Sequence, residues 1–254
     1  MTPDRSVRIT CFQDGAPEPV AAAATVCIDV FRATTTAVTA VVAGRRCFPA
    51  GSLEEAVPLA AALHQPLLVG ELGGNMPYGF DLQNSPAAVA ERPDVWRPAI
   101  LLSTSGTPLL VAAAQTGKAY AACLRNWRAA ADAAAAASAH VEVVGAGARG
   151  EFREEDQICC AWIAERLGAA GHAFADATTA ELVERWSGRA VEEIGAGHSA
   201  AYLRATGQGR DIDFVLEHVD DVACAFVMSA GELVAVTDPS DAEDRGVGRK
   251  VLPA

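Results

Sequence analysis

The sequence has no long hydrophobic run and no segment that resembles a signal peptide at its start. A membrane-spanning helix needs roughly 18 unbroken apolar residues, and no segment of the 254-residue sequence supplies them. Residues 129–139 are apolar but too few, and Asp132 interrupts them. The first ten residues place no apolar stretch behind a basic one, so we expect no signal peptide. These absences predict a cytoplasmic protein without a membrane partner.

A basic patch is also missing. The 20 Lys and Arg residues are outnumbered by 32 Asp and Glu, which gives a net charge of -12. The longest basic grouping, residues 245–250, is dilute. We therefore expect no nucleic-acid partner. Because an acidic surface repels anions, an anionic ligand would need a local site of Arg side chains, backbone N–H groups or a metal ion.

Several familiar catalytic and metal-binding patterns are absent. The 7 cysteines are scattered and odd in number, with no CxxC or HxxxH pair, which favours reduced thiols over disulfides or a structural zinc. A haloacid-dehalogenase site needs a second Asp two residues after Asp29, where Phe31 stands. A cysteine phosphatase needs five residues between Cys and Arg, but Cys27 and Arg32 are separated by four. No GxSxG elbow occurs.

Short apolar runs alternate with helical segments, which predicts an α/β fold: a three-layer α/β/α sandwich with a mostly parallel central sheet. The composition and the lack of a linker predict one domain over residues 1–254. The predicted strands cover residues 7–11, 24–30, 66–69, 99–102, 119–124, 141–144, 222–228 and 233–236. The predicted helices cover residues 33–43, 53–64, 107–115, 127–139, 155–168, 173–187, 199–206 and 211–217.

In such sheets, ligands bind beyond the carboxyl ends of the strands, and the first predicted strand end there is unusually polar. Asp29 and Arg32 precede Thr34, Thr35 and Thr36 at a helix start. The helix N-terminus suits phosphate, Arg32 suits paired oxygens, and Asp29 suits a hard cation. Alternatively, Thr34 caps the helix and Asp29 pairs with Arg32.

Two further clusters follow the next strands. Glu71 ends one strand, and Asp81 lies in the following loop before Ser85, which we expect to cap a helix. The turn at 103–107 is rich in hydroxyl groups and contains glycine, which fits either an anion-binding loop or a capped helix start.

The fourth cluster follows the strand at 141–144. Glu151 lies before the helix and is the better metal candidate, whereas Glu154 and Glu155 suit the helix dipole and are expected to be structural. Cys159 is expected to be buried and inert. A ligand contact is also expected from Asn126. We expect ordinary roles in helix caps and surface ion pairs for Asp176, His198, Asp211 and Asp213.

Together these clusters resemble the ComB family of 2-phosphosulfolactate phosphatases. The family pattern runs approximately IDVLRATTT, GERGG, GFDLGNSP, TTNGT, a strand-end Asn, and AGTEGEFSLED. This chain has IDVFRATTT at 28–36, GELGG at 70–74, GFDLQNSP at 79–86, STSGT at 103–107, Asn126 and AGARGEFREED at 146–156. It departs from the pattern at Leu72, Gln83, Ser105 and 148–149, where Ala-Arg replaces Thr-Glu.

The resemblance implies a cytoplasmic Mg²⁺-dependent phosphatase that converts 2-phospho-3-sulfolactate into sulfolactate and phosphate, in coenzyme M biosynthesis. It leaves a homodimer open. The implied site residues are Asp29, Arg32, Thr34, Thr35, Thr36, Glu71, Asp81, Asn84, Ser85, Thr104, Gly106, Thr107, Asn126 and Glu151.

From these residues we expect Asp29, with Glu71 or Glu151, to hold magnesium. Arg32 and the helix-start N–H groups would stabilise charge on the phosphoryl group, and Asp81 is the expected general base. Two alternatives stay open. One is a phosphatase of another small phospho-hydroxy acid, which the departures at Leu72 and Ser105 suggest. The other is a non-catalytic protein that binds an anionic metabolite.

Overall fold

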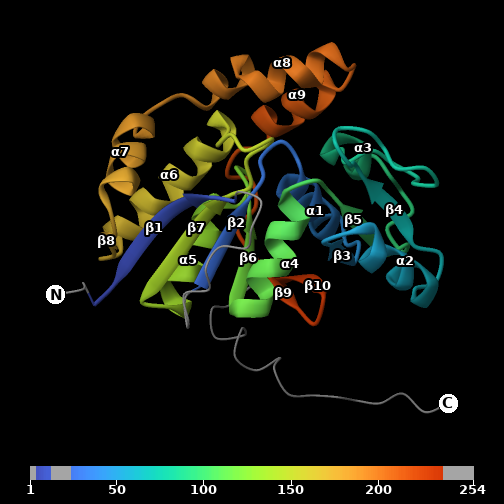
Figure 1. Ribbon diagram of the computed structural model, residues 1–254, viewed down its shortest axis with the longest axis horizontal. Helices are drawn as coiled ribbons and strands as arrows, with labels where there is room; N and C mark the ends of the chain where they lie inside the picture. Colours follow the sequence, from blue (N-terminus) through green and yellow to red (C-terminus); the bar gives the residue numbers. More distant parts are fainter. Residues whose placement is uncertain (1–3, 13–23, 237–254) are drawn as a thin grey trace.

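A computed structural model describes residues 4–12 and 24–236, and the basic grouping at 245–250 lies outside them. The described residues form a ten-stranded sheet in the order β4-β5-β3-β10-β9-β6-β2-β7-β1-β8, flanked by helices (Figure 1). The strands are β1 Ser6–Cys11, β2 Ala24–Ile28, β3 Cys47–Ala50, β4 Leu67–Gly70, β5 Ala99–Leu102, β6 Lys118–Ala122, β7 His140–Gly145, β8 Ala173–Phe174, β9 Ala225–Ser229 and β10 Glu232–Val236.

The α-helices are α1 Ala33–Val42, α2 Leu53–Ala62, α3 Pro86–Ala90, α4 Gly106–Thr116, α5 Trp127–Ala137, α6 Glu154–Ala169, α7 Ala177–Trp186, α8 His198–Ala205 and α9 Gly209–Glu217. A 3₁₀ helix, η1, covers Val191–Ala196. The predicted α/β fold with a mostly parallel sheet is confirmed.

The sheet consists of two parallel groups that are joined by an antiparallel hairpin. Strands β6, β2, β7, β1 and β8 form one group, and β4, β5 and β3 form the other. The hairpin β9–β10 pairs antiparallel with β6 on one side and with β3 on the other. The chain crosses between the groups twice, through α1 from β2 to β3 and through α4 from β5 to β6.

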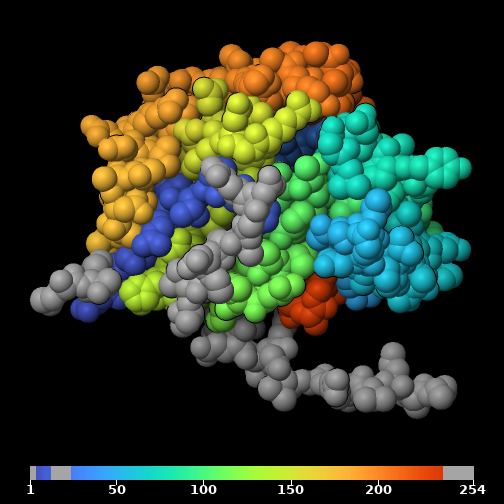
Figure 2. Space-filling view, in the orientation of Figure 1, coloured from blue at the N-terminus to red at the C-terminus, as the bar shows by residue number. Residues whose placement is uncertain are grey.

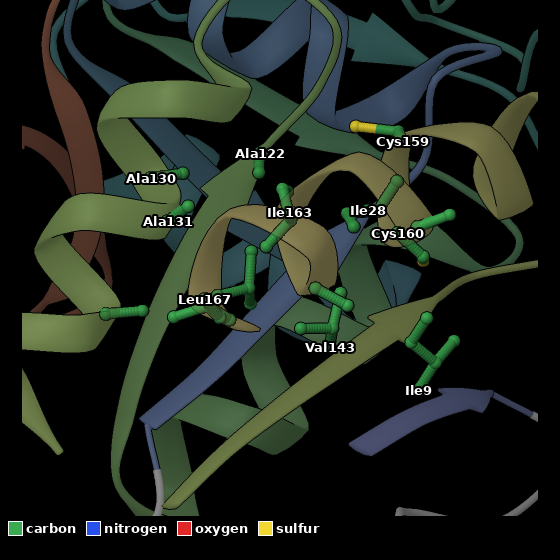
Figure 3. Packing of buried hydrophobic residues seen from close by; sticks show 14 of the residues in the cluster. Ile9, Ile28, Ala122, Ala130, Ala131, Val143, Cys159, Cys160, Ile163 and Leu167 are labelled. Carbon is green, nitrogen blue, oxygen red and sulfur yellow. The ribbon is translucent and has the colours of Figure 1, made fainter. Parts of the chain in front are cut away.

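Strand β2 is buried on both faces, which explains its unbroken apolar sequence. Its residues Val26 and Ile28 belong to one core, which packs against α5 and α6 (Figure 3). Cys27 points to a second core, which includes α1 and α4. Because side chains alternate along a strand, this sheet region has a helical layer on each face.

Helices α8 and α9 lie across the end of the molecule toward which β2 and β7 lead, next to α3 and the start of α6 (Figure 1). Figure 2 shows the orange surface of α8 and α9 above the yellow segment that leads into α6. Ala200, Leu203 and Ile212 form a small cluster of their own, against which Phe31 and Leu216 pack. This pair of helices therefore covers the carboxyl ends of the strands.

Two strands were not predicted. Strand β3 contains Pro49, which has no N–H to donate to a sheet. The pairing of β3 with β10 is at Cys47, so Pro49 lies beyond that pairing. The predicted helix at 173–187 was wrong at its start, because Ala173 and Phe174 form β8. The helix begins at Ala177, where Asp176 caps it as expected by accepting a hydrogen bond from the Thr179 N–H.

All seven cysteines are unpaired, as predicted. Burial raises the pKa of the Cys159 thiol well above its ordinary value, which fits an inert side chain. Within residues 4–12 and 24–236, no helix combines the length and apolar character needed to span a membrane.

Replacing Leu167 by Ala tests the packing between α6 and the sheet. Leu167 is fully buried in the first core, so Leu167→Ala is expected to lower the free energy of unfolding by about 2–5 kcal/mol. Urea denaturation measures this change. Val57→Ala is the matched control, because Val57 is 64% exposed on α2. Equal losses in the two variants would contradict the described core.

Candidate functional site

A cavity of about 230 Å³ lies where the strand-end loops meet α8. Polar residues from all four clusters line it, and α8 contributes a further wall. The lining residues are Asp29, Phe31, Arg32, Glu71, Gly73, Gly74, Asn84, Thr104, Ser105, Gly147, Ala148, Arg149, Arg153, Glu155, Asp156, His198, Ser199, Tyr202 and Leu203.

Asp29 is held at the end of β2 by a closed turn. The Thr34 hydroxyl donates to the Asp29 carbonyl and accepts from the Asp29 N–H, both at 2.8 Å. The Thr35 hydroxyl donates to the Val30 carbonyl, and the Thr36 hydroxyl is buried without a partner among the described residues. None of these threonines lines the cavity. The two bonded threonines therefore shape the loop, and the carboxylate of Asp29 reaches the cavity.

The turn that leads into α4 uses the same device. The Thr107 hydroxyl accepts from the Ser103 N–H at 2.8 Å, and Thr107 is fully buried. Next to it, a Cβ on Gly106 would lie 2.2 Å from Asp29 Oδ2 and 2.7 Å from the Ala33 Cβ. Glycine is therefore required here, because the starts of α1 and α4 touch. Neither Gly106 nor Thr107 lines the cavity itself.

Glu71 connects two of the loops. Its Oε1 accepts from the Thr104 N–H at 2.7 Å, and its Oε2 accepts from the Thr104 hydroxyl at 2.9 Å and from the Gly74 N–H at 2.7 Å. The carboxylate is fixed by these three donors while it lines the cavity.

Glu155, for which a structural role was expected, also lines the cavity, as does Asp156, which the sequence did not single out. Each side chain is 3% exposed. Asp156 accepts from the Val30 N–H at 2.9 Å and from the Gly147 N–H at 3.0 Å, which ties α6 to two loops. Acids are ordinary in the first turn of a helix, so their position alone did not indicate a site.

The carboxyl groups that line the cavity repel one another when ionised, because burial leaves little water to screen their charges. Burial, together with the nearby charges of Glu71 and Glu155, raises the pKa of Asp29 to about 7. Burial also raises the pKa of Glu155. Burial and the charges of Asp29 and Glu155 raise the pKa of Asp156. Without a cation, burial and mutual repulsion favour the protonated form of these carboxyl groups.

Arg32 lines the cavity and is anchored from behind. Its Nη1 donates to Asp211 Oδ2 at 2.6 Å, and the two side chains are only 5% and 3% exposed. Asp211 Oδ1 accepts from the Ser85 hydroxyl at 2.5 Å. Ser85 also caps α3, as predicted, by accepting from the Ala88 N–H. The surface role expected for Asp211 was wrong, because its helix packs its carboxylate against Arg32.

The two predicted asparagines have different surroundings. Asn84 is 2% exposed and lines the cavity, and its Oδ1 has no partner among the described residues. Asn126 is fully buried. It accepts from the Cys123 N–H and donates to the Ala121 carbonyl, so it closes the end of β6 rather than lining the cavity.

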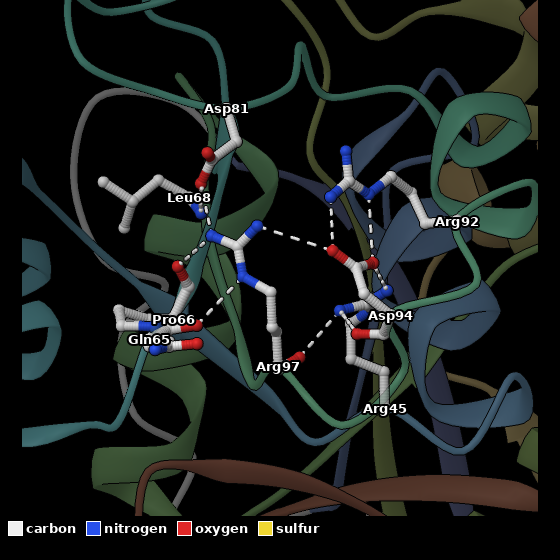
Figure 4. Close-up of polar contacts among 8 residues, drawn as sticks. All are labelled: Arg45, Gln65, Pro66, Leu68, Asp81, Arg92, Asp94 and Arg97. Atoms are coloured by element: carbon white, nitrogen blue, oxygen red, sulfur yellow. Dashed lines mark hydrogen bonds and ion pairs between the residues drawn. The ribbon is translucent and has the colours of Figure 1, made fainter.

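Asp81 lies outside the cavity, in a separate ion-pair cluster (Figure 4). Its Oδ2 accepts from the Leu68 N–H at 2.9 Å and from Arg97 Nη2 at 3.1 Å. Arg97 also bonds Asp94, which pairs in turn with Arg45. This position argues against the predicted role of Asp81 as general base.

Glu151 is also outside the cavity lining. Its side chain is 64% exposed and pairs with Arg153 at 2.6 Å. That pairing argues against the predicted role of Glu151 as a metal ligand. The structure thus brings Asp29, Arg32, Glu71, Asn84 and Thr104 together around the cavity, and it adds Glu155 and Asp156.

Removing the partner of Arg32 tests the buried ion pair. Asp211→Asn leaves the Arg32 charge buried without compensation, so the free energy of unfolding is expected to fall by about 3–5 kcal/mol. Asp213→Asn on the same helix is the control, because Asp213 is exposed. Urea denaturation compares the two. A loss for Asp211→Asn no larger than for the control would contradict a stabilising role for this pair.

The raised pKa of Asp29 has a consequence for stability. At pH values between the ordinary pKa of 3.8 and about 7, the Asp29 carboxyl group is protonated more often in the folded state than in the unfolded state. The free energy of unfolding therefore falls as pH rises through that window. Asp29→Asn removes this titration.

We therefore expect the stability of Asp29→Asn relative to the wild type to increase from about pH 5 to pH 8 without divalent cations. Urea denaturation in a chelator at both pH values measures the difference. If the stabilities of the two proteins changed in parallel with pH, the raised pKa of Asp29 would be contradicted.

The sequence is similar to those of several known proteins. The sequence model of the family described as 2-phosphosulpholactate phosphatase matches residues 12–228. A protein of Deinococcus radiodurans named "Probable 2-phosphosulfolactate phosphatase" is 33% identical over 195 residues, covering 75% of this chain and 81% of its own. A protein of Synechococcus sp. with the same name is 33% identical over 223 residues, covering 82% and 86%.

A third relative, from Methanothermobacter thermautotrophicus, is named "2-phosphosulfolactate phosphatase". It is 30% identical over 191 residues, which cover 75% of this chain and 80% of that protein. The predicted resemblance is confirmed: this chain belongs to the 2-phosphosulfolactate phosphatase family, a family of phosphoric monoester hydrolases.

Proposed function

We propose that this protein hydrolyses 2-phosphosulfolactate to 3-sulfolactate and phosphate, with magnesium bound in the cavity. The main support is one observation: Asp29, Glu71 and Glu155 converge on a cavity that Arg32 also lines. An acidic protein that must bind an anion needs such a local arrangement of cationic groups and metal ligands. The names of the relatives supply the substrate.

Asp29 and Glu71 fit a magnesium ion. Oxygen ligands suit this ion, and it commonly takes one or two protein carboxylates together with substrate phosphate and water. Burial and the charge of Glu71 raise the pKa of Asp29, and a bound cation would favour the ionised carboxylate. The bonds from Thr104 and Gly74 would orient Glu71 as a ligand. The described residues contain no ready-made cluster of three or more His, Cys, Asp or Glu for a metal.

When bound, magnesium polarises a phosphoryl oxygen and lowers the pKa of water. Arg32 donates hydrogen bonds to the phosphoryl oxygens, whose negative charge increases in the transition state. Its guanidinium group is held in place by Asp211, so little reorganisation is needed when the substrate binds.

The reaction needs a group that transfers a proton. A new bond forms between a water oxygen and phosphorus, the ester P–O bond breaks, and a proton lost by the attacking water reaches the leaving alkoxide. Glu155 takes this role in our proposal in place of Asp81, because it lines the cavity and burial raises its pKa.

A change at Asp29 tests the proposal. Asp29→Asn is expected to reduce magnesium-dependent phosphate release from 2-phosphosulfolactate by about 100-fold or more. Asp81→Asn is the matched control, since Asp81 lies outside the cavity, and it should keep wild-type turnover. The proposal fails if Asp29→Asn keeps full turnover. Equal losses in both variants would contradict the assigned site.

A phosphatase of another small phospho-hydroxy acid is the second candidate. It is favoured by Ser105, which lines the cavity where the family pattern has Asn. Leu72, the other departure, does not line the cavity. Rates for 2-phospholactate and 3-phosphoglycerate beside 2-phosphosulfolactate distinguish the two candidates.

A further inference from the structure

One part of the cavity wall carries two arginines and a histidine that have no role in the proposed chemistry. Arg149, Arg153 and His198 all line it. Arg149 stands at the tip of a tight hairpin in which Ala148 and Glu151 exchange two backbone hydrogen bonds of 2.9 and 3.0 Å. The two tip residues have positive φ, +53° at Arg149 and +75° at Gly150.

This hairpin holds Arg149 at the cavity although its backbone conformation is uncommon for a residue with a side chain. Arg149 is exposed, and no hydrogen bond or ion pair links its side chain to another residue of the described ranges. Its guanidinium group therefore keeps all its donors for a ligand.

Arg153 is the more rigid of the two arginines. Its side chain is only 13% exposed. Nη1 lies 2.6 Å from Glu151 Oε2 and 2.7 Å from His198 Nδ1. The imidazole nitrogen must accept here, since a guanidinium group only donates. Nε is buried without a partner in the described part of the chain.

The proposed substrate carries an anionic sulfonate group that the acidic side chains of the cavity wall cannot bind. 2-Phosphosulfolactate carries a sulfonate and a carboxylate besides its phosphate. A sulfonate is a poor ligand for magnesium, and its charge is spread over three oxygens, so it is better matched by guanidinium donors. Arg32 is already committed to Asp211 and to the phosphoryl end.

The geometry points to Arg149 and Arg153 as a second anion subsite that binds the sulfonate and sets substrate preference. This inference rests on the proposed function for the phosphate end of the substrate. Glu151 competes with the sulfonate for Arg153, because it already occupies Nη1 from an exposed position. Removing its charge should therefore strengthen the subsite.

The test compares two substrates that differ only at the sulfonate. 2-Phospholactate has a methyl group where 2-phosphosulfolactate has its sulfonate-bearing carbon. Arg153→Gln is expected to raise KM for 2-phosphosulfolactate by about 10- to 100-fold and to leave KM for 2-phospholactate unchanged. Glu151→Gln is expected to lower KM for the sulfonate substrate alone. Arg166→Gln is the matched control, because Arg166 pairs with Asp132 outside the cavity.

Calorimetry with 3-sulfolactate and lactate provides a readout that needs no turnover. Arg153→Gln should weaken binding of 3-sulfolactate and not of lactate. If no phosphoester is hydrolysed but this difference in binding is found, the proposed function fails and the subsite stands. The subsite is overturned if Arg153→Gln weakens the binding of 3-sulfolactate and lactate equally, or if it changes the binding of neither. Loss of magnesium-dependent turnover in Glu151→Gln would likewise overturn it, because Glu151 would then act as a metal ligand.

Discussion

The contact between the starts of two crossover helices is the constraint on which the site depends. Helices α1 and α4 connect the two parallel groups of the sheet in opposite directions. They begin so close together that a Cβ on Gly106 would lie 2.7 Å from the Cβ of Ala33, the first residue of α1. This closeness brings strand ends of both groups to one cavity. It also explains why residues near 30 meet residues near 71 and 104, although the antiparallel hairpin lies between β2 and the strands β4 and β5.

The cavity combines buried acids with a few fixed cations, and its hydroxyl-rich loops mainly supply rigidity. Thr34 and Thr107 each close a turn through the backbone, and they leave the cavity to Asp29, Glu71 and Arg32. The buried carboxylates repel one another, and this repulsion lowers the stability of the folded protein. Sites that bind a cation commonly carry such a cost, because the same charges are needed for function.

The sequence was sufficient for the fold class and for part of the site. Apolar runs that alternate with helices predict the parallel groups, and polar strand ends predict Asp29, Arg32 and Glu71 at a shared edge. The sequence did not reveal Asp211, because a residue 179 positions after Arg32 is joined to it only by tertiary packing. Glu155 and Asp156 were hidden by their ordinary place in a first helical turn. Asp81 lies in the same loop as Asn84, but it pairs with Arg97 and does not line the cavity.

A crystal structure with Mn²⁺ and inorganic phosphate would show whether the cavity binds a metal ion and a phosphate side by side. Mn²⁺ substitutes for Mg²⁺ at oxygen sites and is located by its anomalous scattering. We expect an anomalous peak within coordination distance of carboxylate oxygens of both Asp29 and Glu71, with phosphate between the ion and Arg32. A peak at Glu151, or phosphate bound away from Arg32, would contradict the proposed site.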